Sequence, residues 1–267
     1  MIMKAILRCR AGMTLVEILM AVAIGSVIGL AIMKIFQSNS QLFSGEKKVT
    51  GMVTTGRNAI GELSHLVRQA GYNHTEATTG LFGLKDSTGS FTTNAITSAK
   101  SIFFTIDDNE DGSLQNNGNE KVGFRFTGVD CDPSANNSSC IEIAQIDPAT
   151  GAISGWIPKI PDIQDLAFIY HYRTGSPGAY VFTDSMCGAA GGASATALPG
   201  ATSITFKCGG VIASPTALLP TNAVAGRNYS DVVGVTIHVL AKTRAKHDLT
   251  KQNVVQLFSS SVVLRSR

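Results

Sequence analysis

The sequence predicts an α+β protein in which a long N-terminal α-helix, membrane-spanning in its first half, packs on a mainly antiparallel β-sheet. Three observations predict this class. An apolar run follows a short basic segment, apolar residues at helical spacing continue to Gly71, and the remainder combines Thr, Ser, Gly and Asn with short β-prone runs. We therefore expect three regions, residues 1–12, 13–70 and 71–267.

The first two regions have the charge pattern of a membrane-targeting segment. Lys4, Arg8 and Arg10 precede an apolar stretch that extends from about residue 13 to 33. This length of helix, at about 1.5 Å per residue, covers roughly 30 Å, the thickness of a hydrocarbon core. Because basic residues stay in the cytoplasm, the sequence predicts one span with the following chain outside it.

A single charge interrupts the apolar stretch. Glu17 is the one charged residue between Arg10 and Lys34. A carboxylate in hydrocarbon costs several kcal/mol or more unless it is paired, so we interpret Glu17 as functional and expect it to have a partner. The alternative is that its side chain only reaches back to the lipid headgroups.

The residues from Gly12 to Glu17, Gly-Met-Thr-Leu-Val-Glu, resemble the class III leader of type IV pilins and type II secretion pseudopilins. The family usually has Phe where this chain has Met13. The resemblance implies that a prepilin peptidase cleaves after Gly12, removes the leader and methylates Met13. It also implies that Glu17 pairs with the N-terminal amine of a neighbouring subunit in the filament.

A second resemblance concerns the end of the helix. The segment Arg68-Gln69-Ala70-Gly71-Tyr72 is similar to the Arg-x-Ala-Gly-Tyr ending of the first helix in PilW-like minor pilins. This resemblance implies a pilin-like fold and a minor pilin that helps to initiate or cap a type IV pilus. A J-type pseudopilin of a type II secretion system is the alternative. The leader disfavours a third possibility, a membrane-anchored enzyme or ligand-binding domain.

The same resemblance implies partners and location. The partners are other pilin and minor pilin subunits, the prepilin peptidase, the inner-membrane pilus assembly platform and, before assembly, membrane lipid. The protein would first be a single-pass protein of the bacterial inner membrane and then part of a fimbrium at the cell surface.

Helical spacing continues beyond the membrane segment. Apolar residues recur at intervals of three, four and seven, which places them on one helical face; they are Val49, Met52, Val53, Ile60, Leu63 and Val67. Gly71 follows as a helix C-terminal signal, because such caps favour positive φ. Gly45, Gly51, Gly56 and Gly61 weaken the helix, and a kink near Ser44-Gly45 is compatible with the sequence.

The third region is predicted to be β-rich. Candidate strands are 101–106, 121–127, 141–146, 165–172, 180–183, 203–207, 231–242 and 254–264. Alternation is clearest in the series Val233, Val235, Ile237 and Val239. No later segment has the helical period that a parallel crossover needs, so we expect antiparallel pairing. The segment Gly188–Ala197, rich in Gly and Ala, is expected to form a surface loop.

Four of the five cysteines follow the membrane segment, whereas Cys9 lies in the leader. An even number in an exported domain predicts disulfide bonds. Three pairings are possible, and we favour Cys131–Cys140 and Cys187–Cys208, since these close the two most loop-like segments. A zinc site is disfavoured because there is no Cys-x-x-Cys motif and no nearby histidine pair.

A candidate calcium site lies in the acidic segment Asp107-Asp108-Asn109-Glu110-Asp111-Gly112. Oxygen ligands at Asp107, Asn109 and Asp111 match the first half of a calcium loop. Glu120 comes two residues after the position of the bidentate glutamate in an EF-hand, which excludes a true EF-hand. We expect either a looser calcium site that includes Glu120 or an acidic hairpin turn without metal.

Charge and motifs disfavour other functions. Three of the 22 basic residues are in the leader, which leaves 19 against 19 acidic residues. This balance does not indicate a nucleic-acid-binding surface. The five histidines have no metal-ligand spacing, and no nucleophile or nucleotide motif is present. We therefore predict a non-enzymatic protein with no cofactor other than the possible calcium ion.

Overall fold

The structure is a computed structural model. It describes residues 14–72, 83–85, 100–115, 118–130, 139–174, 181–184, 193–196, 201–208, 211–213, 232–243 and 253–264. The chain divides into two compact units, residues 1–46 and 47–267.

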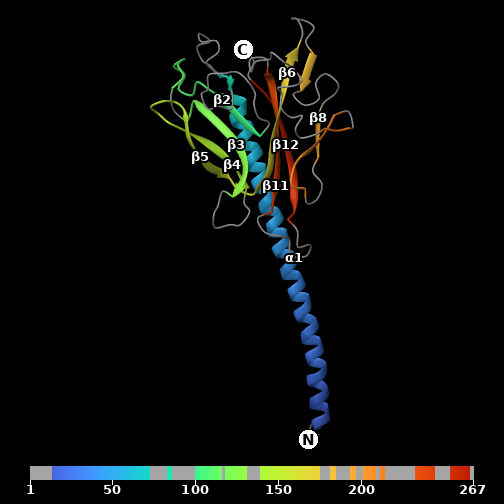
Figure 1. The fold of residues 1–267 in the computed structure, drawn as a ribbon. Coiled ribbons are helices and arrows are strands. Elements are labelled where there is room, and N and C mark those ends of the chain that lie inside the picture. Colours follow the sequence, from blue (N-terminus) through green and yellow to red (C-terminus); the bar gives the residue numbers. More distant parts are fainter. Residues whose placement is uncertain are drawn as a thin grey trace, which may run out of the picture. The chain divides into compact units, whose positions relative to one another are not determined.

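Helix α1 (Leu15–Gln69) belongs to both units (Figure 1). It has no break at Ser44-Gly45, so the glycines of this region are accommodated within helical geometry. Gly71 follows the helix with a φ of 81° and its N–H donates to the Thr105 carbonyl at 3.1 Å. The predicted helix, 13–70, and its glycine C-terminal signal are thereby confirmed within one or two residues, except that Met13 lies outside the described residues.

The described strands of the second unit form two larger sheets and one small sheet, and all their pairs are antiparallel, as expected. The five-stranded sheet has the order β1 (Gly83–Lys85), β2 (Ser101–Thr105), β3 (Lys121–Asp130), β4 (Ser139–Ile146) and β5 (Ile153–Ile160). The four-stranded sheet has the order β12 (Val255–Val263), β11 (Val232–Lys242), β6 (Ile163–Thr174) and β7 (Val181–Asp184). The three-stranded sheet comprises β10 (Val211–Ala213), β9 (Thr205–Cys208) and β8 (Ala193–Thr196).

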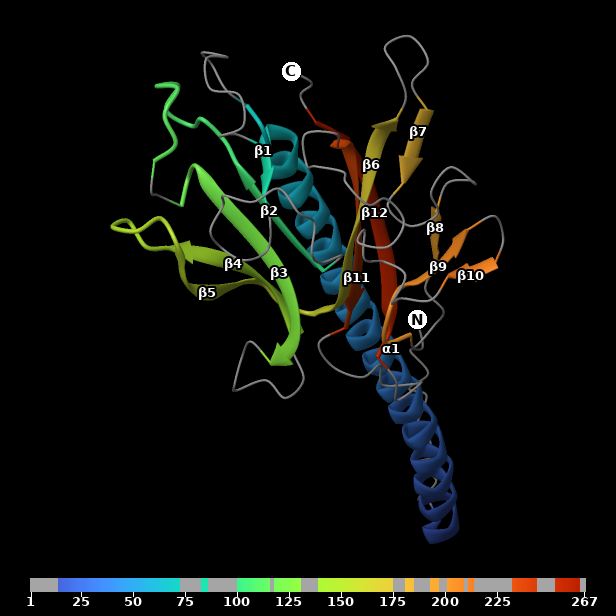
Figure 2. The same cartoon turned by 45° about the horizontal axis from the view of Figure 1, so that its top comes forward.

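The core of the second unit lies between the end of α1 and the two larger sheets, which stand on either side of the helix (Figure 2). The predicted apolar stripe supplies the helix side of this core. Met52, Leu63 and Val67 are fully buried, and Val49, Val53 and Ile60 are partly buried against the same cluster. The sheets contribute residues such as Phe124 from β3 and Val235, Ile237 and Val239 from β11.

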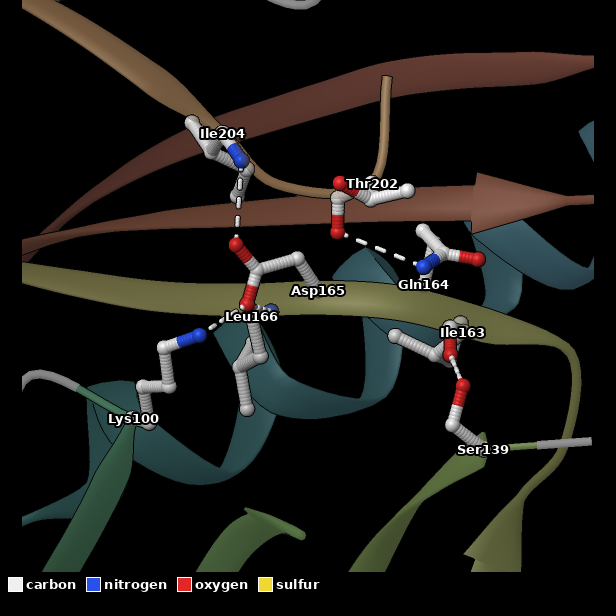
Figure 3. A network of polar contacts seen from close by, with 8 residues as sticks. All are labelled: Lys100, Ser139, Ile163, Gln164, Asp165, Leu166, Thr202 and Ile204. Atoms are coloured by element: carbon white, nitrogen blue, oxygen red, sulfur yellow. Dashed lines mark hydrogen bonds and ion pairs between the residues drawn. The ribbon is translucent and has the colours of Figure 1, made fainter. Parts of the chain in front are cut away.

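Polar contacts join the two larger sheets at the first half of β6 (Figure 3). Lys100, next to β2, forms an ion pair with the buried Asp165 of β6 at 2.7 Å. The second Asp165 oxygen accepts from the Ile204 N–H at 3.0 Å, next to β9. Ser139 of β4 donates to the Ile163 carbonyl. One strand thus holds segments from all three sheets.

The strand predictions are confirmed for the eight segments that were proposed, with shifts of at most three residues at the ends. The sequence did not indicate β1, β5, β8 or β10. Pro158 and Gly155 interrupt the pattern in β5, because both residues are unfavourable inside strands. The expectation of a loop over Gly188–Ala197 was wrong in part, since β8 lies within it and pairs with β9.

One helix glycine is required by packing. A Cβ atom at Gly56 would overlap the ring of Phe258, which comes from β12 and packs against the core. Gly61, one and a half turns later, is exposed and has no atom within 4 Å of such a Cβ. The absence of a side chain at Gly56 therefore allows α1 and β12 to approach closely.

Gly56→Ala is expected to destabilise the second unit by about 1–3 kcal/mol, because the Phe258 ring must move out of a packed position. Gly61→Ala is the matched control and should stabilise by up to about 1 kcal/mol, since alanine favours the helix and meets nothing. Thermal unfolding of the full chain in detergent micelles measures both changes. Equal effects of the two substitutions would contradict the close-approach argument.

Candidate functional site

The first candidate site is the start of α1. Gly12 and Met13 lie outside the described residues, whereas Thr14 and Glu17 are described. The Thr14 N–H and hydroxyl both donate to Glu17 Oε2, at 3.0 and 3.1 Å. The Glu17 N–H donates to Thr14 Oγ1 at 3.3 Å. This is a reciprocal capping box, in which Thr14 is the N-cap residue.

The structure thus adds Thr14 to the predicted site residues. The Thr-x-x-Glu spacing before an apolar run was present in the sequence and is a known helix-start signal. Both bonds from Thr14 go to Oε2, so Oε1 takes part in neither. The chain itself therefore holds the Glu17 carboxylate at the first turn of α1, where the helix dipole favours a negative charge.

Between Glu17 and Lys34 the surface of α1 is apolar and exposed. The large apolar side chains from Leu15 to Phe36, together with Leu42 and Phe43, have exposed fractions of 45–76 %. Ser26, the one hydroxyl residue between Glu17 and Lys34, donates its hydroxyl to the Ala23 carbonyl of the same helix at 2.7 Å. By length and composition, α1 is able to cross a membrane. Such a surface needs lipid or other helices around it.

The second candidate site is the acidic loop between β2 and β3. Asp111 accepts bonds from the Ser113 N–H and hydroxyl, at 2.7 and 2.6 Å, and from the side chains of Gln115 and Asn109. These donors lower the pKa of Asp111 to about 2, with the Ser113 hydroxyl as the main cause. The loop is therefore organised by its own hydrogen bonds, as in the predicted acidic turn.

Two acidic residues of this segment are buried, whereas Asp108 and Glu110 are exposed. Asp107 and Glu120 are at most 1 % exposed. The Gly112 N–H donates to Asp107 at 3.1 Å, and the Gln115 N–H donates to Glu120. Burial raises the pKa of Glu120, and the hydrogen bond from the Gln115 N–H lowers it in part. The neighbouring Asp111 and Asp107 charges raise this pKa further. The acids are close enough to repel one another.

Hydrogen bonds within the loop engage the predicted calcium ligands. In the part of the chain that the structure describes, no three His, Cys, Asp or Glu residues gather as a metal-binding group. Asp111, one of the predicted ligands, already accepts four hydrogen bonds that calcium would have to displace. Calcium binding stays a prediction, and no step of the function depends on it.

The cysteine predictions fall mostly on residues that are not described. Cys140 is fully buried and disulfide-bonded. Cys131 and Cys187 lie outside the described residues, and of Cys208 only its place in β9 is known. The pairing that we favoured stays a prediction.

Two histidines lie on the face of the four-stranded sheet opposite α1. His238 is buried, its Nδ1 lies 2.7 Å from the Ser259 hydroxyl, and its ring meets Phe206 edge to face. Burial, assisted by His171, lowers the pKa of His238 to about 4. The pair of Ser259 and His238 has no acid bonded to the imidazole among the described residues. We interpret His238 as a packed, neutral residue.

Comparison with known proteins gives one match. The family described as prokaryotic N-terminal methylation motif matches residues 7–33. This range contains Gly12, Met13 and Glu17 and continues through the apolar part of α1. The chain carries a prepilin-type signal, which supports a type IV pilin or pseudopilin. No curated protein and no solved structure matches the chain.

Asp111→Ala is expected to lower the melting temperature in calcium-free buffer, because four donors lose their acceptor. Thr54→Ala, which removes an exposed hydroxyl on α1, is the control for loss of a surface polar group. The calcium prediction requires that added calcium raise the melting temperature of the parent chain and not that of Asp111→Ala. If calcium does not change the melting temperature of the parent chain, the calcium prediction is contradicted and the acidic turn without metal is the interpretation that stands.

Stability is expected to fall as the pH decreases from about 6.5 to 4. In this window the unfolded chain protonates its histidines while the folded chain keeps His238 neutral, which costs up to about 3 kcal/mol. Unfolding of His238→Asn should show a shallower pH dependence than the parent, whereas His65→Asn, an exposed control, should follow the parent. Equal slopes for all three chains would rule out this role of His238.

Proposed function

We propose that this protein is a PilW-like minor pilin, which is incorporated into a type IV pilus and helps to initiate or cap it. The observation that carries the proposal is the prepilin-type motif over residues 7–33, which includes the exposed apolar start of α1. The similarity of Arg68-x-Ala-Gly-Tyr72 to the helix ending of PilW-like sequences supports the finer assignment. The motif favours a structural role over an enzymatic one.

In the proposed mechanism, α1 leaves the membrane and packs against the helices of other subunits. The precursor inserts with its leader in the cytoplasm, and prepilin peptidase releases Met13 with a methylated amine. The exposed apolar side chains of α1 then exchange lipid contacts for contacts with neighbouring helices, which leaves the hydrophobic burial nearly unchanged. Apolar contacts alone do not fix how far one helix is shifted along its neighbour. A charged pair at a defined position along the helix is needed to fix this register.

Glu17 supplies this charge. In the free chain its Oε2 is hydrogen-bonded to Thr14, so the carboxylate is held at the helix start. Oε1, which the capping box does not use, is the atom that would accept from the N-terminal amine of the next subunit. Thr14 then acts as a positioning residue, because it fixes the rotamer in which Glu17 presents that oxygen.

A J-type pseudopilin of a type II secretion system is the second candidate, since the same motif serves both machines and the C-terminal hairpin of β11 and β12 suits either. Co-purification separates them. A minor pilin is recovered with pilus subunits, and a pseudopilin with secretion-system components.

Intact and N-terminal peptide mass of the chain from native membranes is the decisive measurement. We expect a chain that begins at methylated Met13. Glu17→Ala should be processed normally but recovered poorly in filaments, whereas Glu46→Ala, an exposed glutamate on the same helix, should behave like the parent. An uncut chain in cells with active peptidase, or normal incorporation of Glu17→Ala, would contradict the proposal.

A further inference from the structure

We propose that the free edge of β12 is a docking edge, to which a neighbouring subunit of the assembly adds an extended, uncharged strand. This inference rests on the proposed function, because it takes the partner from the same filament. The edge of β12 is separate from the prepilin-type motif and from the apolar part of α1.

The hydrogen-bond pattern identifies the groups that point to this edge. The Leu264 N–H donates to the Val233 carbonyl and the Thr243 N–H donates to the Val254 carbonyl, so Val263 and Val255 belong to non-hydrogen-bonded pairs with β11. Register is continuous between them. Every second residue therefore directs its N–H and C=O away from β11: Val255, Leu257, Ser259, Ser261 and Val263.

These groups form an open edge in the described structure. Among the described residues, no strand pairs with β12 on the side away from β11. Ser259, Ser261 and Val263 are exposed, and Val263 has the largest exposed fraction, 77 %, of the large apolar residues that the structure describes. A row of peptide groups that pair with no described strand, beside an exposed valine, is a template for strand addition.

The other edges of the two larger sheets differ from β12 in ways that discourage pairing. Strand β5 contains Pro158 and Lys159 and has two register shifts against β4. Strands β1 and β7 have only three and four residues. Strand β12 has nine residues, no proline, no charged side chain and no bulge against β11. Proteins usually protect long edges with such features, so their absence indicates that this edge is used.

The chemistry of the edge determines the kind of partner. Recognition by peptide groups requires a backbone in extended conformation, and this excludes a helix or a small anion as the main ligand. The exposed side chains beside the edge are the apolar Val263 and the hydroxyls of Ser259 and Ser261, which bond to His238 and Thr236 of β11. A partner strand with small polar and β-branched residues matches them, whereas a charged strand would lose solvation without a counter-charge.

Amide hydrogen exchange at single-residue resolution tests the proposal. In the processed full-length chain in micelles, the amides of Ser259, Ser261 and Val263 should exchange fast, while those of Ser260 and Val262, bonded to β11, should exchange slowly. In filaments that contain the chain, the first set should slow by at least about tenfold. Fast exchange of this set in filaments would overturn the proposal, and so would its protection in a dimer of the free chain.

Variants separate this proposal from the proposed function. Ser261→Pro removes one outward N–H and leaves the bonds to β11, and Ser261→Ala is its control. Val263→Lys places a charge at the edge, and Ile157→Lys places one on the protected β5, where Ile157 is 48 % exposed. We expect Ser261→Pro and Val263→Lys to reduce recovery in filaments, with normal cleavage and unchanged melting temperature.

Normal recovery of both edge variants, with Glu17→Ala still defective, would overturn the docking edge alone. Failure of the parent chain to enter filaments would overturn both proposals.

Discussion

Both larger sheets bury their inner faces against one apolar stripe on the second half of α1, and this shared surface is the constraint on which the second unit depends. The sheets do not pair with each other in the described structure, so the helix completes a core that neither sheet could close alone. Close contact at Gly56 follows from this arrangement, because β12 brings an aromatic ring against the helix there.

The polar contacts at β6 fix how the sheets meet around that core. Asp165 is buried and receives an ammonium group from Lys100 and an N–H from Ile204, so its charge is both paired and hydrogen-bonded. Tyr170, further along β6, donates its hydroxyl to the Ser101 carbonyl at 3.2 Å. Apolar burial has little directional preference, whereas these contacts have one geometry. These polar contacts therefore define the angle between the two larger sheets, whereas hydrophobic burial only brings the sheets together.

The two parts of α1 have different patterns of apolar residues, and each pattern fits a different environment. Gly25 and Gly29 in the first unit meet no other side chain, and the apolar residues around them are exposed. In the second unit the stripe is narrow and buried, and residues outside it, such as Arg57 and Arg68, are exposed. An all-round apolar surface suits lipid or surrounding helices, whereas a stripe suits one fixed domain. This difference supports the proposed role in assembly.

Periodicity and composition determined the helix, its glycine cap and eight strands, because these depend on local spacing, whereas the prepilin-type motif with Glu17 was recognised by resemblance. Tertiary structure decided the rest. Strand β5 contains Pro158 yet pairs along β4, and β8 forms because β9 offers it an edge. Which peptide groups of β12 face outward depends on its register with β11, and the burial of His238 depends on Phe206 from another sheet. Such partners are distant in sequence, and only packing brings them together.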